Sequence, residues 1–139
     1  MADLAVTASR VNVVCPQNAE TFSGIATEAI APGQIVYQLA TGKYGVAAAN
    51  VAGKQQARGY ALRGAAAGEG FGALKRGIAA GFTVPQAADA QLFLSNTPGG
   101  VGDAAGLMAV PIGRVVVSPD SPDLTKLVYF DFDWITQRA

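Results

Sequence analysis

The residue types on which most enzymes depend are scarce in this chain. The 139-residue sequence contains no histidine. Histidine is the commonest general base, a frequent metal ligand and the middle member of Ser-His and Cys-His catalytic pairs, so these chemistries lack their central group. Catalysis would have to rest on carboxylates, lysines or a metal ion.

One pair of carboxylates has the spacing for joint chemistry. Asp131 and Asp133 are two residues apart in a β-forming segment, which puts both side chains on one face of a strand. Such a pair can bind Ca²⁺ or act as acid and base in hydrolysis. The other face carries Phe130, Phe132 and Trp134, the pattern of an amphipathic strand with its charges in solvent. We expect no catalytic residue, no metal site and no cofactor, and a hydrolase using the two aspartates is one alternative.

Two glycine-rich stretches have some features of phosphate-binding loops. The segment Gly68-Glu69-Gly70-Phe71-Gly72 would need a helix directly after it, and Gly77 interrupts too soon. Thr41-Gly42-Lys43-Tyr44 has no Ser or Thr after its lysine and lacks the earlier glycine of a phosphate loop. Neither stretch predicts nucleotide binding.

The charge balance argues against direct contact with nucleic acid. Ten basic and ten acidic residues give a formal net charge of +0. Nucleic-acid binding usually needs a basic stripe, and the nearest approach is Lys75-Arg76, with Arg58 and Arg63. Near-zero net charge also removes the repulsion that keeps copies of a protein apart, which favours self-association.

The low charge content points to a surface shared with partners. Charged residues make up 14% of the chain and apolar residues 50%, whereas an average soluble domain carries about 25% charged residues. We expect part of the surface to be buried against partners and the remainder to consist of small residues.

The single cysteine and the start of the chain bear on location. Because Cys15 is the one cysteine in the sequence, no intramolecular disulfide can form. Cys15 follows an apolar run, so we expect a buried, unreactive thiol. Met1-Ala2-Asp3 lacks the basic start of a signal peptide, and no apolar run approaches about 20 residues. We therefore expect synthesis in a host cytoplasm and no membrane contact.

The distribution of glycine and proline predicts an all-β fold. Short runs of β-forming residues alternate with turn residues, which is typical of a small single-domain β-barrel or β-sandwich with at most one short helix. Any such helix is expected within residues 47–57, over one or two turns at most, with Asn50 as its candidate N-cap. Pro111 and Gly113 suggest a bulge or an edge position. The expected strands cover residues 4–14, 22–30, 35–39, 44–46, 59–63, 70–75, 78–84, 91–94, 108–117 and 124–134.

Turn chemistry repeats within the chain. Ala31-Pro32-Gly33-Gln34 and Ala66-Ala67-Gly68-Glu69 both read Ala-X-Gly followed by an amide or acid, ahead of an apolar strand. We interpret them as one hairpin chemistry used twice.

A further turn is expected at Arg76-Gly77. The domain itself is expected over residues 21–139, preceded by an extended arm and first strand at 1–20.

Three segments of the sequence resemble the capsid cement, or head decoration, proteins of tailed bacteriophages. The first reads Ala29-Ile30-Ala31-Pro32-Gly33-Gln34-Ile35-Val36-Tyr37, and the second runs from Ala57-Arg58-Gly59-Tyr60 to Ala67-Gly68-Glu69. The third joins Leu92-Phe93-Leu94-Ser95-Asn96-Thr97-Pro98-Gly99-Gly100-Val101 to Val110-Pro111-Ile112-Gly113-Arg114-Val115. Together the segments span roughly residues 22 to 134, and similar units also occur in phage fibre and tail proteins.

The resemblance implies a β-tulip or jelly-roll-like domain on the outer surface of a phage head. Its partners would be the major capsid protein and further copies of itself, as a homotrimer at threefold positions or a homodimer at twofold positions. There it would bridge capsid subunits and stabilise the virion, because binding only to the assembled shell adds to the stability of that shell.

Candidate contact residues come from both ends of the chain. An N-terminal arm over residues 2–10 could add a strand to a neighbouring subunit, which makes Leu4, Val6 and Arg10 candidate interface residues. Tyr129 and Trp134 join them, because core or subunit contact is the expected role of the C-terminal aromatic cluster.

Two further functions stay open as alternatives. A receptor- or carbohydrate-binding module of the head-fibre or tail-fibre class would present exposed aromatic residues in a groove. A shell-forming or tail-tube subunit would assemble with itself without a separate capsid lattice.

Overall fold

The structure, a computed structural model, describes residues 3–14, 17, 19–117, 126–132 and 134. It is all-β, as the sequence predicts. A 3₁₀ turn spans Ala8–Arg10. The strands are β1 (Ala5–Val6), β2 (Asn12–Val14), β3 (Glu20–Ile25), β4 (Ile35–Gln38), β5 (Tyr44–Val46), β6 (Ala57–Ala61), β7 (Gly70–Ala80), β8 (Phe82–Thr83), β9 (Gln91–Leu94), β10 (Val101–Gly102), β11 (Pro111–Val117) and β12 (Lys126–Asp131).

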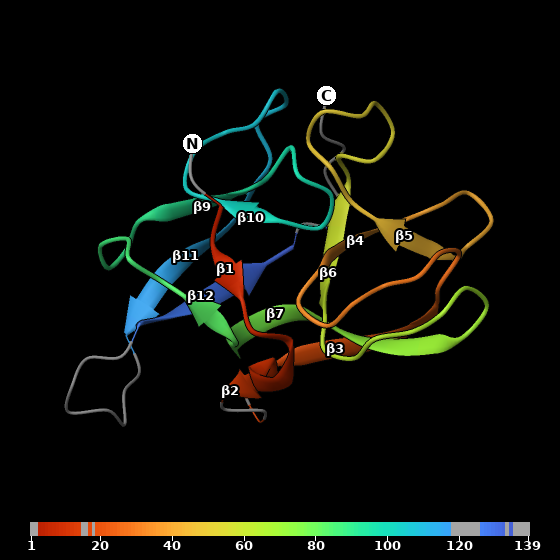
Figure 1. Cartoon of the computed structure of the whole chain (residues 1–139), viewed down its shortest axis with the longest axis horizontal. Helices are drawn as coiled ribbons and strands as arrows, with labels where there is room; N and C mark the ends of the chain where they lie inside the picture. Colours follow the sequence, from red (N-terminus) through yellow and green to blue (C-terminus); the bar gives the residue numbers. More distant parts are fainter. Residues whose placement is uncertain (1–2, 15–16, 18, 118–125, 133, 135–139) are drawn as a thin grey trace.

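One curled sheet contains most of these strands. Its order is β10-β9-β11-β12-β7-β6-β4-β5, and β2 and β3 pair along the other edge of β7. The long strand β7 joins two parts of the molecule (Figure 1). Its first half pairs with β3 and β6, and its second half pairs with β2 and β12.

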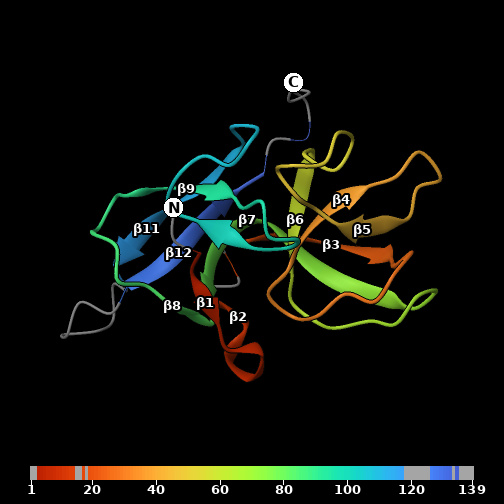
Figure 2. The ribbon, with the colours of Figure 1, turned by 45° about the horizontal axis from the view of Figure 1, so that its top comes forward.

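Two hydrophobic cores fill the two parts. The larger core lies inside β9, β11 and β12, and the smaller core lies inside β3, β5 and the start of β7. Figure 2 shows β6 between the two groups of strands. On β4, β6 and β7 neighbouring residues point to opposite cores, as expected from the alternation of side chains in a strand: Ile35, Tyr60 and Leu74 enter the larger core, and Val36, Ala61 and Ala73 enter the smaller. This shared layer is therefore apolar on both faces.

Residues 26–28, which follow β3, run beside β5 and form hydrogen bonds with it. Ala26 forms a parallel bridge with Tyr44, and the Thr27 amide donates to the Tyr44 carbonyl at 2.8 Å. The Glu28 carboxylate accepts from the Val46 amide at 3.1 Å. These contacts give part of the edge of β5 hydrogen-bond partners, which an open sheet edge would lack.

The helix expected within residues 47–57 is absent, so that prediction is wrong. Ala47, Ala48 and Ala49 are buried, and their amides donate to the carbonyls of Ile35, Lys54 and Ser95. A tight turn follows, in which Gly53 adopts a φ of 89°. In this turn the Lys54 amide donates to the Val51 carbonyl at 3.1 Å, and the left-handed φ of Gly53 stops a right-handed helix from continuing, so Asn50 caps no helix.

The turn expected at Arg76-Gly77 is also wrong. Strand β7 runs through it without interruption, and Gly77 pairs with Phe130 at a φ of 143°. A side chain at Gly77 would meet Ala19 at 2.9 Å. This glycine lets β7 pass close to a neighbouring segment and does not reverse the chain.

The repeated turn chemistry is confirmed, but only the second turn connects two paired strands: β6 pairs with β7, whereas β3 and β4, on either side of the first turn, do not pair. In the first turn the Ala31 amide donates to the Gln34 side chain at 2.9 Å, and in the second the Ala66 amide donates to the Glu69 carboxylate at 2.8 Å. Gly33 and Gly68 have φ values of 89° and 88°, the left-handed conformation that glycine adopts without strain. The long side chain thus stabilises each turn.

Pro111 and Gly113 lie at a bulge, one of the two expected positions. The register between β9 and β11 shifts between these residues, while β11 pairs with β12 on its other side. Strand β11 is therefore internal, and the irregularity accommodates the proline that cannot donate to the ladder.

Candidate interaction surface

Alternation along the strands of the larger part produces an outward face opposite the core. Val115, Val128 and Ala79 point inward and are buried. The residues between them point outward, and the sheet register places one row of these across β9, β11, β12, β7 and β2. The members of this row are Gln91, Arg114, Tyr129, Ile78 and Val14. We call this row and the charged row beside it the outer sheet face.

The row is polar at its β9 end and apolar from its centre to its β2 end. Val14, Ile78 and Tyr129 are each half-buried, whereas Gln91 and Arg114 are exposed. Val116 and Leu127 are cross-strand neighbours, also half-buried, on the same side of the sheet. Half-exposed apolar side chains beside charges are typical of surfaces that bind another protein.

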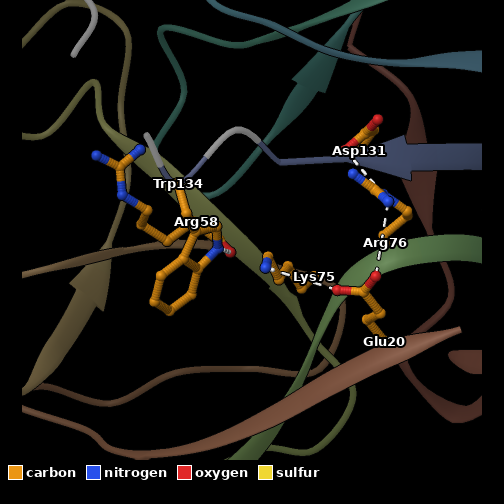
Figure 3. Close-up of polar contacts among 6 residues, drawn as sticks. All are labelled: Glu20, Arg58, Lys75, Arg76, Asp131 and Trp134. Carbon is orange, nitrogen blue, oxygen red and sulfur yellow. Dashed lines mark hydrogen bonds and ion pairs between the residues drawn. The ribbon is translucent and has the colours of Figure 1, made fainter. Parts of the chain in front are cut away.

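A network of charges forms the second row (Figure 3). Arg76 Nε lies 3.2 Å from Asp131 Oδ1, and Arg76 Nη1 lies 3.6 Å from Glu20 Oε1. Lys75 Nζ lies 3.5 Å from the other oxygen of Glu20. The bulge between Glu20 and Thr21 gives β3 a local change of register beside these two cations.

Arg76 is the hub of this network. Its hydrogen bond to Asp131, the charge of that carboxylate and the charge of Glu20 raise the pKa of the guanidinium above its ordinary value. The side chains of Arg76, Asp131 and Glu20 are all about half exposed, so water and salt weaken each attraction. The network fixes the directions of these side chains more than it stabilises the fold.

Trp134 lies at the border between this network and the smaller core. Its indole Nε1 donates to the Arg58 carbonyl at 2.8 Å, and Lys75 Nζ lies 5.6 Å from the ring centroid. Its ring packs edge-on against Phe22 at 5.1 Å. Figure 3 shows the indole beside Lys75. Trp134 therefore covers part of the smaller core and also contacts the charged row.

Tyr129 borders a shallow hollow of about 250 Å³. Arg114 and Asp131 lie along the same hollow, together with the bulged segment around Gly113. A positive and a negative side chain therefore border one depression, suited to a polar group of a partner.

The candidate residues of the N-terminal segment lie elsewhere. Leu4 is 5% exposed and belongs to the larger core, so its side chain is already buried within its own chain. Val6 is 37% exposed and lies over Gly33, and Arg10 is exposed in the 3₁₀ turn. Strand β1 pairs with β8, while Tyr129 on β12 neighbours β11 and β7. The structure thus places the candidates in two separate groups.

Backbone groups of the N-terminal segment are also occupied. The Leu4 amide donates to the Val101 carbonyl at 2.8 Å, and the Thr7 amide donates to the Gly81 carbonyl at 2.7 Å. Ser95 donates a 2.6 Å hydrogen bond to the carboxylate of Asp3. Addition of this segment to a neighbouring subunit stays a prediction, and it would require these bonds to break first.

The carboxylate pair of the hydrolase alternative is described only in part. Asp131 points outward and is ion-paired to Arg76, while Phe130 and Phe132 are buried on the other side, as the alternating pattern predicts. Asp133 and Cys15 lie outside the described residues. Within the described ranges, no three acidic or cysteine side chains gather as metal ligands would. The part of the chain that the structure describes also contains no helix that could span a membrane.

Sequence reasoning missed several members of the outer sheet face. Glu20, Ile78 and Arg114 are far apart in the chain and become neighbours only through the pairing of β3, β7, β12 and β11. Outward alternation along each strand was the available signal. The alignment of one strand with another depends on tertiary packing, so it could not be read from any single segment.

Comparison with known proteins finds no match to this chain among family models, curated proteins or solved structures.

Proposed function

We propose that this chain is a structural protein of a tailed-phage virion, a capsid cement protein that binds the outer surface of the head and bridges major capsid subunits. The observation that carries the proposal is the outer sheet face, where Ile78 and Tyr129 form an apolar centre beside paired charges. The sequence resemblance supplies the identity of the partner.

The chemistry of that face suits binding to a large protein surface. An apolar centre gains free energy by leaving water, and charges of both signs set orientation and register against complementary groups. Because Arg76 and Asp131 already hold each other, docking need not order them anew. A cement protein needs only this kind of complementarity to the assembled shell.

Binding to phage heads tests the proposal directly. The purified chain is mixed with undecorated procapsids and with mature heads, and bound protein is measured by co-sedimentation and imaging. We expect saturable binding to heads, with native mass measurement distinguishing a homotrimer from a homodimer. Failure to bind any head lattice contradicts the proposal.

A matched pair of variants locates the binding face. Ile78→Lys places a charge in the centre of the outer sheet face, and we expect a loss of head binding of at least about fivefold, from a desolvation cost of about 1–3 kcal/mol. Lys43→Glu changes charge at an exposed turn distant in the sheet order and should bind as the native chain does. Equal binding by both variants would remove this face from the proposal.

The fibre-type alternative makes use of the hollow beside Tyr129. A carbohydrate-binding module would use that ring with Arg114 and Asp131 as polar contacts. Specific hits on a glycan array, lost in Tyr129→Ala, would favour this function over the capsid role.

A further inference from the structure

A second hollow, on the other half of β7, contains glycines whose presence the fold does not explain. It measures about 490 Å³ and is lined by residues of β3, the start of β7 and the segment after β6. Gly72 lies in its floor, pairs with Ser23, and has no heavy atom within 4 Å of the position that a Cβ would occupy. Its φ lies outside the left-handed region. Neither conformation nor packing within the described residues requires a glycine there.

A glycine in a strand has an energetic cost. Glycine in the middle of a strand destabilises it by about 0.5–1 kcal/mol relative to alanine, and it often marks a place where another group approaches the backbone closely. Gly70 also lies in this hollow, paired with Ile25. A Cβ added at Gly70 would have a backbone oxygen at 3.7 Å as its nearest contact. The floor of the hollow is therefore bare backbone.

The walls of the hollow have a defined chemistry. Ile25 on β3 is 46% exposed and offers an apolar side chain at the edge of the hollow. On the other side lies Arg63, which makes no hydrogen bond or ion pair with any described residue. The apolar wall and the guanidinium, which has no partner among the described residues, match the two faces of an aromatic ring, since arginine is attracted to aromatic faces. The backbone floor matches the edge of that ring.

The same chain places aromatic rings on glycines inside the smaller core. A Cβ on Gly59 would lie 2.6 Å from the ring of Phe22, and a Cβ on Gly24 would lie 2.5 Å from the ring of Tyr44. In both places the missing side chain provides the space that a ring occupies. Gly72 offers the same kind of seat on the outside, without a ring from the described residues.

We infer that the hollow bounded by Ile25, Arg63, Gly70 and Gly72 is a socket for an aromatic side chain presented by a partner protein. The edge of the ring meets the backbone of β7, with Ile25 against one face and the Arg63 guanidinium against the other. The inference rests on the proposed function only for which protein carries the aromatic residue.

Titration of the isotope-labelled chain with a mimic of that side chain tests the socket. The probe is N-acetyl-tryptophanamide, and N-acetyl-leucinamide is the aliphatic control, both at millimolar concentrations. We expect saturable shifts of the backbone amide signals of Ser23, Ile25 and Gly72 with the aromatic probe alone. Absence of shifts at these residues, or equal shifts with both probes, would overturn the inference.

Three variants make the test specific. Gly72→Val places two methyl groups in the socket on a Cβ that would have no heavy atom within 4 Å, so the chain should fold while the shifts at Ser23 and Ile25 disappear. Arg63→Gln should weaken binding of the aromatic probe by about threefold, the effect of a cation–π contact at an exposed site. Thr21→Val, on β3 but outside the hollow, should bind as the native chain does. Unchanged binding by Gly72→Val would overturn the inference.

The head-binding assay separates this inference from the proposed function. If the native chain does not bind heads but the probe titration gives the expected shifts, the capsid role fails and the socket stands. If heads bind the native chain and the probe gives no shifts, the socket fails and the capsid role stands.

Discussion

The aromatic rings of the two cores are packed in different ways. The larger core contains many large side chains, and its rings of Tyr60, Phe130 and Phe132 lie in series with centroid separations of 4.8 and 5.2 Å. The smaller core contains Ala26, Ala61 and Ala73, and its rings lie against glycines. Both cores also contain alanines and rings that pack on one another, but in the smaller core two rings occupy the space of missing side chains, at Gly24 and Gly59.

This difference shows that glycine has two roles in one all-β chain. At Gly33 and Gly68 it adopts a left-handed conformation and reverses the chain. At Gly24 and Gly59 it removes a side chain from a strand so that a ring can occupy the space. The first role depends on local conformation and the second on tertiary contacts, so the two cores should respond differently to substitution.

The largest effect is expected in the larger core. Phe130→Ala removes a fully buried ring that stacks on Tyr60 and Phe132, and should lower the free energy of unfolding by about 3–5 kcal/mol. Urea denaturation measures this change. Tyr129→Ala, one residue away on the outer sheet face, should lower it by about 1 kcal/mol or less. Similar losses for both variants would contradict the inward and outward assignment.

A smaller loss is expected from adding a methyl group to the smaller core. Gly59→Ala would place a Cβ 2.6 Å from the Phe22 ring, and the resulting overpacking should destabilise the fold by about 1–3 kcal/mol. Gly72→Ala is the matched control in a strand with open space, and should be neutral or stabilising by about 0.5–1 kcal/mol. Thermal unfolding of the two variants compares them, and the same sign for both would contradict the seating of rings on glycine.

Tyr60 should make the larger core sensitive to alkaline pH. Its hydroxyl donates to the Ala80 carbonyl at 3.3 Å, and burial raises the pKa of Tyr60 well above its ordinary value. Because the folded pKa is the higher one, the stabilisation is fully present below the unfolded pKa of about 10 and is lost as pH rises above it. Burial also raises the pKa of Tyr44, opposed by the charge of Arg58.

The variant Tyr60→Phe isolates this effect. At neutral pH it should cost about 1 kcal/mol, the net value of one hydrogen bond. Between pH 9 and about 11 its free energy of unfolding should fall less than that of the native chain. Parallel pH profiles for the two proteins would show that Tyr60 does not titrate from a buried, neutral state.

The smallest effect is expected outside both cores. Arg76→Gln removes the hub of the exposed charge network and should change stability by no more than about 1 kcal/mol. Added salt should reduce the difference further, because it screens exposed charges. A loss that exceeds that of Gly59→Ala, or that persists in high salt, would mean that the network stabilises the fold as the cores do.

The sequence by itself determined the local features of this protein. Period-two alternation and frequent turn residues indicated the all-β class, and Ala31–Gln34 and Ala66–Glu69 were identified as one turn chemistry, because such signals act within a few residues. The inward positions of Phe130 and Phe132 followed from the same alternation.

Only the tertiary structure decided what distant segments do to one another. It placed Gly77 inside a continuous strand, kept residues 47–57 from forming a helix, and buried Leu4 in the core. It also brought Glu20, Arg76 and Asp131 into one network. The physical reason is that strand register and the close approach of a ring to a glycine are fixed by packing between segments, whereas turn geometry is fixed by the residues of the turn itself.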